Sequence, residues 1–98
     1  PIHVTENGLG AHDALEGGTV HDLERIDYLR DHLRAVLEAL RQGVDVRGYY
    51  VWTLLDNFEW AWGYEKRFGL VHVDFADQRR TWKDSARWYA DVVARHGL

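Results

Sequence analysis

The hydrophobic pattern at the start of the chain predicts a short strand that runs into a polar turn. Ile2-His3-Val4-Thr5 is β-branched and apolar, and Glu6-Asn7-Gly8 follows it with a glycine that can adopt positive φ. Residues 9–18 mix glycine, alanine and acidic side chains without a period, which predicts a loop. Loops of this length often carry function, so the end of this strand is a first candidate position for a site.

The next segment predicts an amphipathic helix over residues 20–42. Thr19 and Asp22 have the spacing of an N-terminal capping box, and Gly43 marks the end of the helix. One apolar stripe recurs at every third or fourth position: Leu23, Ile26, Leu29, Leu33, Val36, Leu37 and Leu40.

The second half of the chain predicts two further strands and a second helix. Residues 46–55 form a β-branched and aromatic run without alternation, which indicates a strand covered on both faces. Residues 68–75 predict another strand. Residues 79–82 could pair with it as the second strand of a hairpin. The last helix is expected to begin near Asp84 and to stop at Gly97.

This order of elements indicates an α/β protein built from two βα units. In such architectures the chemistry lies at the carboxyl ends of the strands. A (β/α)8 barrel takes about 250 residues, so a chain of 98 residues amounts to two or three of the eight units. Because two parallel strands alone leave open edges and an uncovered helix stripe, we expect the chain to need a partner segment in order to fold.

Composition and charge exclude several classes of protein. The formal net charge of −4 argues against a duplex nucleic-acid binder, and no apolar run is long enough to span a membrane. The lack of a leader predicts a cytoplasmic protein, although an amino-terminal region outside this sequence could hold one. The chain has no cysteine for a disulfide or a thiolate ligand. It has no methionine and begins at Pro1, which indicates a piece of a longer protein or a processed product.

Two segments carry candidate chemistry. Glu6 follows the first strand directly, and a carboxylate held by a strand end and a tight turn is preorganised as a nucleophile or base. Residues 52–64 crowd three of the five tryptophans together with two carboxylates and an amide. Sugars are recognised by this mixture, since their C–H faces stack on aromatic rings and their hydroxyls bond to carboxylates and amides. The alternatives are a solvated loop glutamate and tryptophans that belong to the core of a large protein.

Taken together, several motifs identify a family. They are Val-Thr-Glu-Asn-Gly at 4–8, Trp-Thr-Leu-Leu-Asp-Asn-Phe-Glu-Trp at 52–60, Gly63-Tyr64, Arg67-Phe68-Gly69-Leu70, Val73-Asp74 and Lys83-Asp84-Ser85-Ala86-Arg87-Trp88-Tyr89. In order and spacing these resemble the carboxyl-terminal part of family 1 glycoside hydrolases, the β-glucosidase family. The resemblance covers essentially all of the chain.

The resemblance implies an α/β fold that is the carboxyl-terminal portion of a (β/α)8 TIM barrel, about strands 7 and 8 with their helices. Residues 1–98 are then one segment of a single catalytic barrel. The implied activity is the hydrolysis of terminal β-D-glycosides with retention, through a glycosyl-enzyme formed on Glu6. No cofactor is implied, and the implied partners are a β-glucoside or related small saccharide and the remaining amino-terminal barrel segment.

The resemblance also implies which residues hold the sugar. Trp52 corresponds to the stacking platform, and Glu59 to the acceptor of hydrogen bonds from two neighbouring hydroxyls. Trp60 corresponds to an indole N–H donor, and Phe68 to a wall of the pocket near the exocyclic hydroxymethyl group. Since the carboxylate of Glu59 would repel phosphate, we expect an unphosphorylated glycoside as substrate.

One part of the machinery is missing from the sequence. Retaining hydrolysis needs a second carboxylic acid about 5 to 5.5 Å from the nucleophile. In this family it lies in an Asn-Glu-Pro motif, and the only proline here is Pro1. Asp56 is a candidate, but its place before Asn57 suits a structural role better. We therefore expect the chain alone to be inactive.

Other interpretations remain open at the sequence level. The same tryptophans with Glu59 could form a non-catalytic carbohydrate-binding fragment, although such a sandwich should alternate in residues 46–55. The leucine stripe could dock on a partner, which would be the rest of the same barrel. The spacings of His3, His12, Asp13 and His21 match no metal-ligand pair, so no metal is expected.

A few charged positions carry predictions of their own. Arg67 is the cation expected to be buried against a carboxylate, and His72 is expected at the surface. Asp22 and Arg25 are interpreted as solvated or structural charges.

Overall fold

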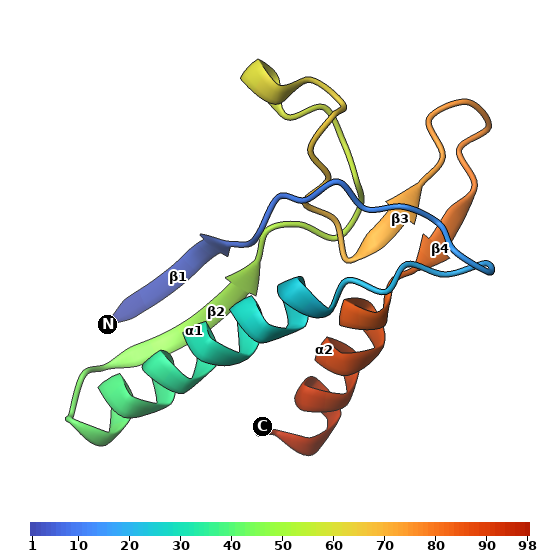
Figure 1. The fold of residues 1–98 in the computed structure, drawn as a ribbon. Coiled ribbons are helices and arrows are strands. Elements are labelled where there is room, and N and C mark those ends of the chain that lie inside the picture. Colours follow the sequence, from blue (N-terminus) through green and yellow to red (C-terminus); the bar gives the residue numbers. More distant parts are fainter.

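The structure is a computed structural model that describes residues 1–98. Its elements follow one another along the chain as strand, helix, strand, one 3-10 turn, a hairpin and a final helix (Figure 1). They are β1 (Ile2–Asn7), α1 (Leu23–Arg41), β2 (Val46–Val51), η1 (Trp60–Trp62), β3 (Val71–Val73), β4 (Arg80–Trp82) and α2 (Asp84–Arg95).

The first three elements form a βαβ unit. β1 and β2 pair in parallel, and α1 connects them and lies along the pair (Figure 1). Gly43 turns the chain from the helix back into β2 with a φ of 89°, a conformation that side-chain-bearing residues rarely adopt. The predicted first strand, helix and parallel pairing are confirmed, with β1 continuing two residues past Thr5.

α1 begins later than predicted, because the residues before it form contacts with other parts of the chain. α1 starts at Leu23 rather than at residue 20, and the predicted cap is wrong. The hydroxyl of Thr19 lies 3.4 Å from the carbonyl oxygen of Trp82, and the carboxylate of Asp22 bonds to Arg25 and Ser85. α2 starts at Asp84 as predicted. Neither helix is both long enough and apolar enough to cross a membrane.

The predicted strand over residues 46–55 is shorter than expected because the chain changes partners after Val51. The N–H of Thr53 donates to the carbonyl of Phe68, and the N–H of Val71 donates to the carbonyl of Leu54. Residues 53–55 thus run beside β3 instead of continuing beside β1. β3 in turn pairs with β4 as an antiparallel hairpin, which confirms the predicted turn-back although β3 covers only Val71–Val73.

The core is small. It centres on Leu29, Leu70 and Ala86, so α1 and α2 meet over the start of the hairpin. Only 15 of the 98 residues are buried, and the radius of gyration is 14.4 Å, above the value of about 13 Å typical of a compact 100-residue domain. β2 is not covered on both faces within this chain, since Tyr50 is 58% exposed.

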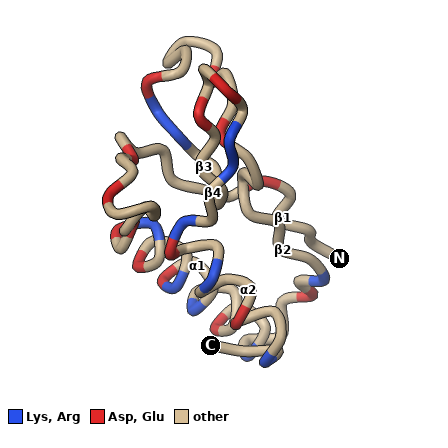
Figure 2. Tube along the Cα trace, turned by 90° about the vertical axis from the view of Figure 1, so that its right-hand side faces the viewer, with Lys and Arg blue, Asp and Glu red and all other residues tan.

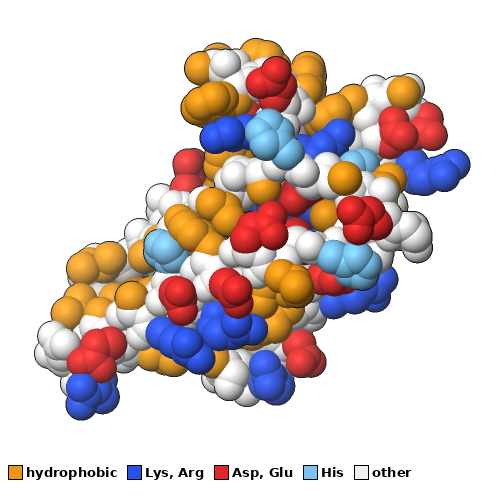
Figure 3. All heavy atoms as spheres, viewed as in Figure 1, with side chains coloured by type: hydrophobic (Ala, Val, Ile, Leu, Met, Phe, Trp, Pro, Cys, Tyr) orange, Lys and Arg blue, Asp and Glu red, His pale blue; other side chains and the backbone are white.

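The surface carries much of the apolar side-chain area. Figure 3 shows hydrophobic side chains over the projecting loop at the top and beside β1 at the lower left. An apolar hollow between the helices is lined by residues that include Leu33, Leu37 and Val93, of which Leu37 is 50% and Val93 57% exposed. Apolar surface of this extent marks sites of association.

His72 is buried, so the prediction of a surface position is wrong. It lies in the middle of β3 with 6% of its surface exposed, and its Nδ1 atom has no hydrogen-bond partner. Burial, followed by the positive charge of Arg67, lowers its pKa below the ordinary value, so the imidazole is held neutral. All three residues of β3 are buried, because the strand is sandwiched between β4 and the continuation of β2.

We predict that the isolated chain binds a hydrophobic dye and self-associates at micromolar concentration. The exposed apolar side chains have no partner in this chain, so their burial against another copy is favourable. Light scattering should give a mass above 11.5 kDa, and the paired substitution Leu37→Glu with Val93→Glu should lower both dye binding and mass. Arg34→Glu, at an exposed position of the same helix, serves as the control for added negative charge. A dye-free monomer of 11.5 kDa would contradict the prediction.

Candidate active site

The candidate nucleophile stands on an irregular part of β1. Val4 pairs with Tyr49 and Asn7 pairs with Val51, so three residue steps of β1 match two of β2. The extra residue falls at Thr5–Glu6, outside the regular ladder. A bulge of this kind re-aims a side chain, and bulges are common beside active sites. Glu6 is exposed, and its carboxylate forms no hydrogen bond or ion pair within the chain.

The ends of β1 and β2 lie very close together. The backbone N–H of Trp52 donates to the carbonyl of Asn7 at 2.8 Å. A Cβ atom on Gly8 would lie 1.7 Å from the carbonyl oxygen of Trp52, so only glycine fits there. This hydrogen bond joins Trp52, at the start of the aromatic segment, to Asn7, the residue that directly follows Glu6.

The aromatic segment brings two predicted sugar-binding residues together and leaves a third apart. The indole Nε1–H of Trp52 donates to Oε1 of Glu59 at 3.2 Å, across seven residues of loop. Trp60 is 83% exposed at the tip of this loop, with a φ of 48° that is uncommon for a bulky residue. Its ring meets Phe58 edge-on, with centroids 6.2 Å apart, rather than any predicted site residue.

Phe68 approaches the same region from the hairpin side. Its carbonyl accepts a hydrogen bond from the N–H of Thr53 at 3.1 Å, directly beside Trp52. Its ring covers Gly10, where a Cβ atom would lie 2.5 Å from the ring. The half-buried Phe68 therefore links the loop after β1 to the loop after β2.

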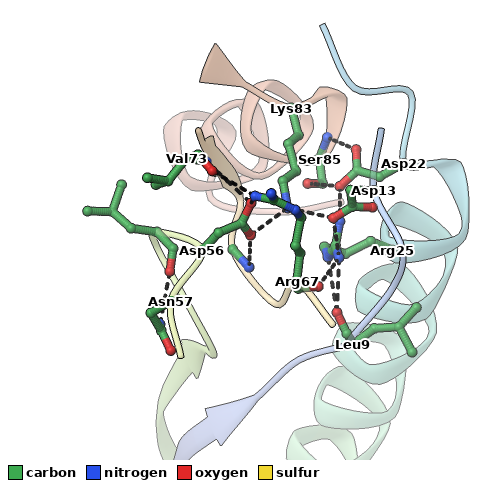
Figure 4. A network of polar contacts seen from close by, with 12 residues as sticks. Leu9, Asp13, Asp22, Arg25, Asp56, Asn57, Arg67, Val73, Lys83 and Ser85 are labelled. Carbon is green, nitrogen blue, oxygen red and sulfur yellow. Dashed lines mark hydrogen bonds and ion pairs between the residues drawn. The ribbon is translucent and has the colours of Figure 1, made fainter. Parts of the chain in front are cut away.

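Behind these residues, charged side chains form a buried network (Figure 4). The guanidinium of Arg25 is fully buried and pairs with Asp13 at 2.8 Å and with Asp22 at 2.5 Å. It also donates to the carbonyl oxygens of Leu9 and Arg67. Arg25 is therefore a structural charge, and the alternative of a solvated one is wrong.

The network continues through Lys83 to the aromatic segment. The ammonium of Lys83, fully buried, lies 2.5 Å from Asp13 and 2.9 Å from Asp56. The other oxygen of Asp56 pairs with Arg67 at 2.8 Å, and the N–H of Gly69 also donates to this carboxylate. The predicted burial of Arg67 against a carboxylate is confirmed, and the many contacts of Asp56 are those of a structural residue.

The pairing decides the charge states. Burial by itself would raise the pKa of Asp56, but hydrogen bonds from Lys83 and Arg67 outweigh it and lower the pKa. Burial would lower the pKa of Arg25, and the contacts with Asp13 and Asp22 outweigh that effect and raise it. Asp56 and Arg25 are therefore both held in their charged forms. Other charged side chains of α1 form exposed pairs three residues apart. Figure 2 shows acidic and basic positions distributed along this helix.

Sequence reasoning missed most of this network. In the sequence Asp13 stands out only beside histidines whose spacings match no metal site, and Lys83 only within a family motif. One signal was available: Arg25 lies four positions before Leu29 and next to Ile26, which puts it at the edge of the apolar stripe. A cation at such a position is buried only with partners, and those come from residues far away in the sequence.

Glu6 and Trp60, both predicted site residues, are exposed at the surface of the chain. The surface has three hollows, and none of them is lined by a predicted site residue. Asn7, the last residue of β1, lines one of them. No group of three or more histidine or acidic side chains is placed to hold a metal ion. What the chain offers is an exposed carboxylate at an irregular strand end and an indole–carboxylate pair on the segment that follows the neighbouring strand.

Comparisons with known proteins identify the family of the chain. The family model for glycosyl hydrolase family 1 matches residues 1–98. A bifunctional beta-D-glucosidase/beta-D-fucosidase of Bifidobacterium breve is 55% identical, over 98% of this chain and 22% of its own length. A 6-phospho-beta-galactosidase of Leptotrichia buccalis is 52% identical, over 93% of this chain and 20% of its own length.

Structural similarity is equally close. The solved family 1 b-glucosidase of Thermotoga maritima superposes with a TM-score of 0.96 at 52% identity, covering 98% of this chain and 22% of that one. The chain thus spans about a fifth of the length of these relatives. The predicted fold, a part of a (β/α)8 barrel, is confirmed by this superposition. With a match along its whole length, the chain belongs to glycosyl hydrolase family 1.

Proposed function

We propose that the chain supplies about strands 7 and 8 of a retaining β-glycosidase barrel, at its carboxyl-terminal end, and that Glu6 is the nucleophile. The observation that carries the proposal is the position of Glu6: a free carboxylate in a bulge at the carboxyl end of β1, beside Trp52 and its partner Glu59. Barrel enzymes carry their chemistry at this end of the strands.

In the proposed reaction Glu6 attacks the anomeric carbon and forms a glycosyl-enzyme, which water then hydrolyses with retention. The leaving oxygen must be protonated by a carboxylic acid, and the Asn-Glu-Pro motif expected to carry that acid does not occur in this chain. The acid/base comes from the amino-terminal part of the barrel, which this chain does not contain. The chain alone is therefore inactive, and the assembled barrel is the working enzyme.

The sugar lies on the surface next to Glu6. Trp52 stacks on its C–H face, Glu59 accepts hydrogen bonds from two hydroxyls, and Trp60 donates its indole N–H. The exposed Trp60 reaches the sugar when the rest of the barrel closes over the loop. Phe68 forms the wall near the hydroxymethyl group.

The substrate is an unphosphorylated β-D-glycoside such as a glucoside. The relative from Leptotrichia buccalis is named for a 6-phosphorylated substrate, so both classes occur at similar identity. In this chain the carboxylate of Glu59 bonds to Trp52 at the sugar-binding surface, and a second anion there would be repelled.

A second candidate function uses the same surface without catalysis. The chain would bind carbohydrate through Trp52, Trp60 and Glu59 as a separate fragment. The exposure of Trp60 favours binding, but the small core and the open edge of β1 favour a chain that is completed by further strands.

The test uses a chimera in which this chain replaces the matching fifth of the Thermotoga maritima b-glucosidase. We predict that the chimera hydrolyses nitrophenyl β-glucoside, and that Glu6→Ala lowers kcat by several orders of magnitude while sugar binding is largely kept, since the bond-forming carboxylate is lost. Glu38→Ala, an exposed glutamate on α1, is the control. Steady-state rates and inhibitor binding give the two readouts.

Two outcomes would count against the proposal. A folded chimera without activity would show that this chain cannot complete the barrel, and an active Glu6→Ala variant would remove the nucleophile assignment. Sugar binding by the isolated chain at the affinity of the chimera would favour the carbohydrate-binding alternative.

We further predict that Glu59→Ala lowers kcat/KM for β-glucosides and β-galactosides about 10- to 100-fold, because hydrogen bonds to a charged group are lost. Glu65→Ala, an exposed glutamate of the same loop, should leave kcat/KM within about twofold. The rates are compared with those on the 6-phosphorylated substrates. An unchanged kcat/KM for Glu59→Ala, or a preference of the unmodified chimera for the phosphorylated substrates, would contradict the role given to Glu59.

A further inference from the structure

We propose that Tyr28 and Tyr49 are positioning residues that act through the side chain of Asn7 to hold the bulge on which Glu6 stands. The inference rests on the proposed role of Glu6 as nucleophile. The inference names the residues that fix the position of the Glu6 carboxylate. Neither tyrosine is marked for this role by the sequence motifs.

The contacts form a continuous bridge across three elements. The hydroxyl of Tyr49, on β2, donates to Oδ1 of Asn7 at 2.5 Å. The Nδ2 amide of Asn7, on β1, donates to the hydroxyl of Tyr28 on α1 at 3.1 Å. Both donors and both acceptors have defined directions, so the carboxamide orientation is fixed from both ends. Asn7 thereby ties β1 to the helix and to the neighbouring strand.

The bridge lies next to the irregular part of β1, where the pairing with β2 is interrupted. The extra residue at Thr5–Glu6 leaves that part of the strand without regular ladder partners, and bulged residues are held by what lies beyond them. Asn7 is the first residue after the bulge, and its carbonyl accepts the N–H of Trp52. Side-chain and main-chain contacts at Asn7 therefore close the bulge directly behind Glu6.

The two tyrosines are themselves firmly placed. Tyr28 packs against the core cluster around Leu29, and its ring lies 3.9 Å from that of His32, centroid to centroid. Burial, with neighbouring Tyr89 and Tyr28, raises the pKa of Tyr49 to about 12, so its hydroxyl remains a donor throughout the range in which the enzyme would be assayed. An aspartate in place of Asn7 could still accept from Tyr49 but could not donate to Tyr28.

The bridge acts mainly on the strand that carries Glu6. It also reaches Trp52 through the carbonyl of Asn7, whereas Glu59 and Trp60 stand further along the loop after β2. Loss of the bridge should therefore displace the nucleophile from the anomeric carbon and leave the contacts of Glu59 and Trp60 in place. A displacement of about 1 Å costs on the order of 100-fold in rate.

The experiment measures kcat and KM in the chimera for Tyr28→Phe, Tyr49→Phe, the double variant and Asn7→Asp. The burst of released nitrophenol counts the active sites, so that unfolded molecules do not enter kcat. We expect kcat to fall about 10- to 100-fold in each single variant, with KM within about threefold. The two tyrosine changes should be non-additive, since both act through one amide. Tyr89→Phe removes a half-buried hydroxyl without a bond to Asn7 and should leave kcat within about twofold.

The result that would overturn the proposal is a kcat per active site within about twofold of the unmodified chimera in both tyrosine variants and in Asn7→Asp. Equal losses in kcat for Tyr89→Phe would also overturn it, since they would reflect general loosening of the core. Failure of the proposed function is seen separately, because it leaves the unmodified chimera inactive or the Glu6→Ala variant active.

Discussion

The structure depends on a cluster of three cations and three carboxylates buried behind the strand ends: Arg25, Arg67, Lys83, Asp13, Asp22 and Asp56. Burying a single ion costs several kcal/mol, and the cluster is tolerable only because every charge is paired and hydrogen-bonded. Removing one member would leave its partner as an uncompensated buried charge. Such a network favours the arrangement of the chain in which all of its members are paired. In a segment with so small an apolar core, it sets the relative positions of the loops.

Its position explains how the candidate site is built. Asp56 belongs to the segment that carries Trp52 and Glu59, while Arg67 precedes Phe68 in the chain. Both segments that carry the proposed sugar-binding residues are therefore anchored to the same buried charges. The strand end that carries Glu6, the proposed nucleophile, is held by a different set of contacts, the amide of Asn7 between two tyrosines. Glu6 and Glu59 are thus supported by different side chains, although Trp52 is joined to Asn7 through the backbone.

Apolar side chains are exposed on this chain because it is only a part of a barrel. A βαβ unit buries one side of its sheet under a helix and leaves the other side and the strand edge to neighbouring units. The exposure of Tyr50 on β2, and of the leucines and valines between the helices, is what remains when those neighbours are not in the chain. A separate carbohydrate-binding domain would be expected to cover such surface within itself.

The sequence by itself determined the secondary structure and the family. Hydrophobic period set the helices and strands to within a few residues, because local side-chain spacing decides which face can be buried. The ordered motifs around Glu6 and Trp52 identified the family before any coordinates. Only the tertiary structure decided which polar residues are buried: Arg25 and His72 lie inside because partners or walls come from segments far along the chain. The bulge at Glu6 and the early end of β2 were also decided there, since each depends on hydrogen bonds between distant backbones, which no local pattern encodes.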